Sequence, residues 1–119
     1  MLAHAEECLK SEDYDLAALL AEHSVQLYLK SLILELTGEV PRAHSIRQLF
    51  HMLRSILGEG RAEKIDLFVR KYRRLLIGLE GAYLASRYLF RIYERSETEE
   101  LVKFAKEVIV FVENIRVKT

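Results

Sequence analysis

Apolar residues recur every three or four positions along almost the whole chain, which is the spacing of one face of an α-helix. Divided at glycine, proline and capping residues, this pattern predicts helices over residues 2–9, 14–37, 45–57, 62–88 and 98–116. No stretch of the sequence alternates apolar and polar residues for long enough to form a strand. The sequence therefore predicts an all-α fold.

Short segments separate the predicted helices. Gly38 suits the left-handed residue that closes a helix, and Pro41 follows it in the next loop. A Gly-Glu-Gly sequence at 58–60 divides the next two helices, and residues 96–99 have the spacing of a capping box before the last one. Because short connections favour antiparallel neighbours, we expect one domain over 1–119, an up-and-down antiparallel helical bundle of four main helices plus a short N-terminal helix.

The predicted helix 14–37 is apolar on two faces. One face includes Ala17, Ala21, Val25, Leu29 and Leu32, and the second consists of Leu16, Leu19, Leu20, Leu27 and Leu34. The remaining polar stripe is Glu22, Gln26 and Lys30, each four residues apart and so stacked on one edge. A monomer would leave apolar surface open that soluble proteins seldom expose. The sequence favours a two-fold dimer that covers it; the alternative is that the short first helix does so.

Composition narrows the class of protein. Half of the 119 residues are apolar and 30% are charged, as in a globular domain. Eighteen basic residues balance eighteen acidic ones, so no global attraction to nucleic acid or anionic lipid is expected. The single asparagine and the abundance of Glu, Lys and Arg resemble the composition of thermophile proteins.

The single cysteine and the N-terminal sequence bear on location. Cys8 has no partner for an internal disulfide, which favours a reducing interior and a packing role for its thiol. The N-terminus resembles no signal peptide, and no apolar run approaches the roughly 20 residues that span a bilayer. We expect a cytoplasmic protein with no membrane partner.

The four histidines do not suggest a metal centre. No pair has metal-ligand spacing with a carboxylate in support, so neither a metal site nor a cofactor is expected. His23 lies in the most apolar helix and is interpreted as a packing residue, and His51 as a solvated one four residues after Arg47. His44 immediately precedes a predicted helix start and is expected to help fix it.

Basic residues gather late in the chain. They are Arg70, Lys71, Arg73, Arg74, Arg87, Arg91 and Arg95. Arg87 near the end of its helix can project into a groove beside Arg91, and the arginine fork suits phosphate. The alternative is a solvated face whose arginines pair with acids such as Glu80 and Glu94.

Three stretches, in this order, resemble those of the HEPN family, small helical domains of archaea and bacteria. The first is DYDLA at 13–17 with AEHSVQLYLK at 21–30, where an acid or amide and a lysine frame alanines. The second is PRAHSI at 41–46, a proline and a histidine before a helix, and the third is LEGAYLASRY at 79–88, which holds an arginine-tyrosine motif. The resemblance implies an antiparallel helical bundle that dimerises.

The resemblance also implies two activities. Many HEPN members are metal-independent ribonucleases whose Arg-x(4–6)-His motif forms a composite cleft between two subunits. Others work beside a minimal nucleotidyltransferase in toxin–antitoxin pairs or related complexes. In this sequence no histidine follows Arg87, and Arg47 with His51 is one residue too close for the motif. The usual proton-transfer group for attack by the ribose 2′-hydroxyl is therefore missing.

The sequence-based hypothesis is a non-catalytic HEPN-like homodimer that binds a minimal nucleotidyltransferase and a nucleotide, RNA or other anion. The residues expected to line its groove are Arg87, Tyr88, Arg91, His44, Glu80 and Lys30. The alternative is an endoribonuclease in which Arg87, Arg91 and either His44 or Tyr88 replace the missing histidine. A third interpretation is a structural dimer without a ligand.

Overall fold

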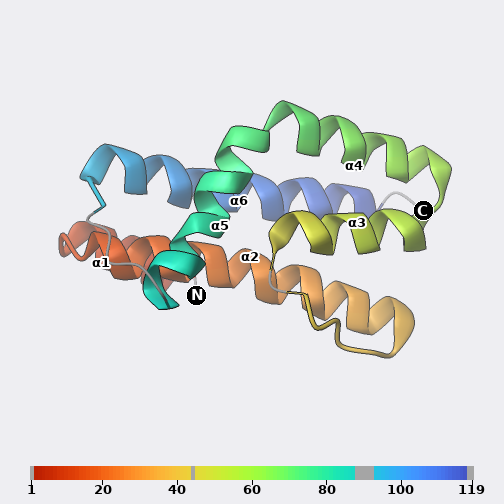
Figure 1. Cartoon of the computed structure of the whole chain (residues 1–119), viewed down its shortest axis with the longest axis horizontal. Coiled ribbons are helices and arrows are strands. Elements are labelled where there is room, and N and C mark those ends of the chain that lie inside the picture. The colour runs from red at the N-terminus through yellow and green to blue at the C-terminus, as the bar shows by residue number, and fades with distance from the viewer. Residues whose placement is uncertain (1, 44, 88–92, 118–119) are drawn as a thin grey trace.

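A computed structural model describes residues 2–43, 45–87 and 93–117, with the backbone alone at 84–87 and 117. The described residues form no strand and six helices: α1 (Leu2–Lys10), α2 (Tyr14–Thr37), α3 (Ile46–Leu57), α4 (Glu59–Lys71), α5 (Arg73–Arg87) and α6 (Arg95–Val117) (Figure 1). They form an elongated body of 41 × 24 × 23 Å. The predicted all-α class is confirmed.

The two longest helices, α2 and α6, lie side by side along the long axis of the molecule (Figure 1). Three interactions give their direction. Asp15 accepts a hydrogen bond from the backbone N–H of Tyr93, just before α6. Further along, Tyr28 pairs with Glu113 and Glu35 pairs with Arg116. Residue numbers rise together on both helices, so α2 and α6 run parallel, in contrast to the antiparallel neighbours expected from short connections.

The segment expected as a single helix over 62–88 is two helices that meet at Tyr72. Tyr72 has φ −108° and ψ 22°, outside helical geometry, and its N–H still donates to the carbonyl of Phe68. After this break α5 crosses over α2 instead of continuing along α4 (Figure 1). The break redirects the chain, so that α5 packs against α2, α3 and α6.

The helix boundaries follow local capping chemistry in part. Gly38 adopts the expected left-handed conformation at φ 81°, and its N–H donates to the carbonyl of Leu34 over 2.7 Å. α3 starts after Ser45, whose hydroxyl accepts a hydrogen bond from the N–H of Gln48. The last helix starts at Arg95, so the expected capping box at 96–99 lies inside its first turn.

One hydrophobic core connects all the long helices. Its largest fully buried side chains include Leu29 of α2, Phe50 and Leu53 of α3, Leu76 and Leu79 of α5, and Phe104 and Val108 of α6. Small residues such as Ala17 and Ala21 let neighbouring helices approach α2 closely. Within the described ranges, no helix is both long and apolar enough to cross a membrane.

Candidate functional site

Glu80 of α5 holds the start of α3. Its carboxylate accepts a hydrogen bond from the hydroxyl of Ser45 and a second from Nε of Arg47, the latter over 2.6 Å. The Glu80 side chain is mostly buried, whereas Arg47 is partly exposed. Because Ser45 also caps α3, one buried carboxylate ties the first turn of α3 to the middle of α5.

A hollow of about 1040 Å³ opens beside this arrangement, between α3 and α5. Its lining includes Arg42, Ser45, Arg47, His51, Ile77 and Glu80. Arg42 and His51 are exposed, and Arg42 makes no ion pair with any residue that the structure describes. The start of a helix carries partial positive charge from its free N–H groups. Arg42 and the start of α3 therefore give the hollow local positive charge that suits an anion, while the charge of Arg47 is offset by its ion pair with Glu80.

A second carboxyl lies behind the hollow, in α2. Glu22 is completely buried, and its Oε2 accepts a hydrogen bond from Nε2 of Gln26 over 2.9 Å. Its Oε1 has no hydrogen-bond partner among the described residues. Burial raises the pKa of Glu22 to about 7; the Gln26 hydrogen bond lowers it, the charge of Glu80 raises it and that of Lys30 lowers it. Glu22 is thus poised to hold a proton near neutral pH.

The polar stripe of α2 is only partly the edge that the sequence suggested. Glu22 and Gln26 are buried, and Lys30 is half-buried. Burying a polar group costs free energy unless it forms a hydrogen bond. The hydrogen bond between Gln26 and Glu22 meets part of this requirement. The stripe therefore consists of a buried polar pair, Glu22 and Gln26, followed one turn later by the half-buried Lys30.

The sequence-predicted site residues fall into two groups. Glu80 lies in the hollow, and Lys30 is near enough to Glu22 for its charge to lower the pKa of that carboxyl. Arg87 is the last residue of α5, and its side chain lies outside the described atoms. The predicted residues outside the described ranges are His44, Tyr88 and Arg91. A groove formed by Arg87 and Arg91 stays a prediction.

Sequence reasoning missed the roles of Ser45, Arg47 and Glu22. Arg47 was interpreted as one of a solvated pair with His51, but it binds Glu80. The signals were weak: a serine at a helix start, and one acid at a turn's distance from Val25 and Ala18 in the most apolar helix. The serine does not indicate its partner Glu80, which lies on another helix, and the acid does not show that the fold buries it.

The surroundings of the described histidines His23 and His51 and of Cys8 fit the packing and surface roles expected from the sequence. His51 is exposed as expected, and His23 is half-buried on α2. Cys8 is buried, and this burial, followed by the charges of Asp13 and Glu7, raises the pKa of its thiol. A protonated thiol is a poor nucleophile, which agrees with the predicted packing role. The described residues contain no cluster of three or more His, Cys, Asp or Glu side chains that could hold a metal ion.

Two exposed arginines, Arg74 of α5 and Arg95 of α6, pair with acids of α6. Arg74 lies 3.5 Å from Glu100, and Arg95 lies 2.9 Å from Glu99 one turn along the same helix. Arg70, Lys71 and Arg73 are exposed around the junction of α4 and α5. These residues fit the solvated-face alternative.

Comparison with known protein families shows which family the chain belongs to. The sequence model of the HEPN domain matches residues 1–115, almost the whole chain. The chain belongs to the HEPN domain family. Neither a curated protein nor a solved structure matches it significantly. In this HEPN domain the described parts of the three stretches lie on α2, at the start of α3 and on α5, and the hydrogen bond from Ser45 to Glu80 joins the second to the third.

Replacing Glu80 with alanine is expected to lower the unfolding free energy by about 1–3 kcal/mol, because Ser45 and Arg47 lose a shared, mostly buried acceptor. Urea denaturation followed by helical circular dichroism measures the loss. Glu99→Ala is the control, since that carboxylate pairs with Arg95 on the surface and should change stability little. Equal losses in the two variants would contradict a structural role for the Glu80 contacts.

Proposed function

We propose that this HEPN domain is a non-catalytic interaction subunit that forms a homodimer and pairs with a minimal nucleotidyltransferase. In this proposal the hollow between α3 and α5 binds a nucleotide or another anion. The observation that carries the proposal is an exposed row of leucines along α2, the central helix of the fold.

This row, the α2 seam, consists of Leu16, Leu20, Leu27 and Leu34. Their spacings of four and seven residues place all four on one line along the helix. Leu16, Leu27 and Leu34 are 38%, 42% and 41% exposed although α1 packs on α2. The first helix thus leaves most of the seam open. A straight apolar stripe of this kind is covered well by the same stripe of a second copy across a two-fold axis.

The anion part of the proposal rests on charge at the start of α3. Arg42 and Arg47 line the hollow, and the hydrogen bond that Nε of Arg47 donates to Glu80 holds its guanidinium in place. A planar guanidinium donates two parallel hydrogen bonds to phosphate or carboxylate, which makes arginine the preferred group for such ligands.

The α2 seam gives the most direct test of the homodimer. The variant carrying Leu27→Glu and Leu34→Glu is expected to be a monomer, because four buried carboxylates per dimer would face each other without partners. Light scattering of the purified protein measures the mass. Leu36→Glu is the matched control, since Leu36 is also exposed on α2 but lies about half a turn of rotation from Leu27. A wild-type monomer, or a dimer that survives both substitutions in the seam, would contradict the proposal.

Pairing is tested by mixing the wild-type protein with a minimal nucleotidyltransferase encoded beside it and measuring the mass again. A dimer that gains mass supports an interaction subunit. A protein that ignores this partner at micromolar concentration contradicts the pairing while leaving the homodimer standing.

The non-catalytic part has its own test. Structured RNA incubated with the pure protein and a chelator is expected to remain intact, since the family's motif histidine is missing after Arg87. Cleavage that an Arg87→Ala substitution abolishes would overturn this part and support the endoribonuclease alternative.

A further inference from the structure

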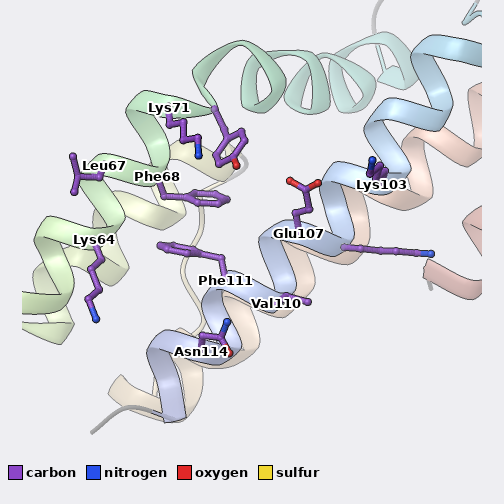
Figure 2. A pocket seen from close by; sticks show the side chains of 11 residues that line it. Lys64, Leu67, Phe68, Lys71, Lys103, Glu107, Val110, Phe111 and Asn114 are labelled. Atoms are coloured by element: carbon purple, nitrogen blue, oxygen red, sulfur yellow. The ribbon is translucent and has the colours of Figure 1, made fainter.

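An apolar groove of about 690 Å³ runs between α4 and α6, away from the hollow described above. Figure 2 shows Phe68 of α4 and Phe111 of α6 facing one another across it. Their ring centroids are 4.0 Å apart and the rings are nearly parallel, at 10°. Tyr72 packs against Phe68 at one end, with centroids 4.8 Å apart. The two stacked rings are in contact and close the space between α4 and α6, so the groove has an aromatic floor that is only partly buried.

Both rims of this groove, the α4/α6 groove, carry exposed apolar side chains. Leu67 on α4 is 56% exposed and Val110 on α6 is 58% exposed, the highest values for apolar side chains in the described helices. Because Leu67 and Val110 flank the aromatic floor, one on each side, they form one continuous apolar surface with it rather than two isolated apolar residues. Contiguous apolar surface rimmed by polar residues is typical of an interaction site.

The polar residues of the rims are mainly cationic. Lys64 and Lys71 lie on α4, and Lys103 lies on α6 (Figure 2). Lys106 of α6 also lines the groove. Lys106 pairs with Glu6 of α1, whereas the other three lysines make no ion pair with any residue of the described chain. Glu107 is the single acid of the lining. A chain with zero formal net charge thus presents a local excess of positive charge on both sides of an apolar floor.

The length of the groove limits what can occupy it. Lys64 and Lys71 are seven residues apart on α4, or about 10 Å along the axis, and Lys103 and Asn114 on α6 are about 16 Å apart. This span matches two to three turns of a helix. An amphipathic helix that places apolar residues at i, i+3 or i+4, and i+7 in a groove uses the same length.

We propose that the α4/α6 groove binds a short amphipathic helix of a partner protein, with apolar side chains on Phe68 and Phe111 and acidic side chains beside the lysines. Charge complementarity selects this occupant. A second copy that used the same groove would bring two lysine-rimmed surfaces together, which like-charge repulsion opposes. The proposal goes beyond the function proposed above, because it requires neither the α2 seam nor a nucleotidyltransferase.

The test uses the full chain and a labelled helical peptide of roughly 15 residues with leucines at i, i+3 and i+7 and glutamates on both flanks. Fluorescence anisotropy is expected to show micromolar binding that weakens with salt. A matched peptide with lysines in place of the glutamates is expected to bind about tenfold more weakly or not at all. Equal affinity for the two peptides, or no binding of the acidic peptide, would overturn the proposal.

Two variants locate the binding. Val110→Glu is expected to weaken binding of the acidic peptide by about tenfold or more, because it places an acid on the apolar rim. Val40→Glu is the control, because Val40 is 60% exposed in the loop before α3 and does not line the groove. The affinity of this variant for the acidic peptide should equal that of the wild type. Thermal unfolding of both variants checks that they fold.

Reversing the charge of the groove lysines tests whether charge complementarity determines which peptide binds. A triple variant with Lys64→Glu, Lys71→Glu and Lys103→Glu is expected to prefer the lysine peptide, which mere loss of folding cannot produce. Two results would each overturn the proposal. One is binding of dodecanoate in the groove without binding of the acidic peptide. The other is self-association that Val110→Glu abolishes.

Discussion

Replacing Glu22 with glutamine is expected to remove most of the pH dependence of stability between about pH 5 and about pH 8. Burial, the largest cause, raises the pKa of this carboxyl from 4.5 to about 7. The folded protein therefore binds this proton more tightly than the unfolded chain does. The contribution of Glu22 to stability is highest below pH 4.5, falls as the pH rises to about 7 and changes little above it, by on the order of 3 kcal/mol in all.

Glutamine has nearly the same shape as glutamate and carries no charge to desolvate, so the variant is expected to be the more stable protein at pH 8. Its carbonyl oxygen can still accept the hydrogen bond from Gln26. Urea denaturation at several pH values, at one protein concentration, measures both effects.

Glu99→Gln provides the matched control, because Glu99 is exposed and pairs only with Arg95 one turn away. Its stability should follow the wild-type pH profile. If the Glu22→Gln profile also followed the wild type, Glu22 would not be the buried proton-binding group that the structure places in α2.

Replacing Phe104 with alanine is expected to cost about 3–5 kcal/mol of unfolding free energy. Phe104 is 2% exposed and packs against Tyr72 and Phe68, with ring centroids 5.4 Å and 6.2 Å away. It fills the space between α4 and α6 below the aromatic floor. Since a small domain is stable by about 5–15 kcal/mol, this loss should lower the thermal midpoint by many degrees.

Thermal unfolding of Phe104→Ala measures this loss, and Leu67→Ala is the control. Leu67 lies on the same side of the fold but is mostly exposed, so its truncation should change stability by roughly 0.5 kcal/mol or less. A loss below about 1 kcal/mol for Phe104→Ala would show that the neighbouring rings move into the vacated space. The aromatic floor would then be less rigid than its close stacking indicates.

Most helix boundaries and the family signature could be predicted from the sequence, because they depend on residues close together in the chain. The apolar spacing predicted α2 at its observed bounds, and Gly38 ends it through a conformation that other residues seldom adopt. Along α4 and α5 the same reasoning failed. Residues 70–74 contain neither glycine nor proline, so nothing local predicts the break at Tyr72. The packing of Tyr72 on Phe104 of α6 and of α5 across α2 decides it.

The arrangement of the site likewise depended on the tertiary structure. The sequence nominated Glu80 and Lys30, but Arg47 binds Glu80 from 33 positions away and Ser45 from 35. A period of four placed Glu22 and Gln26 on one edge of α2 without showing what covers that edge. Periodicity determines which side chains share a helix face. Only the packing of helices determines which face is buried, and burial is what raises the pKa of Glu22.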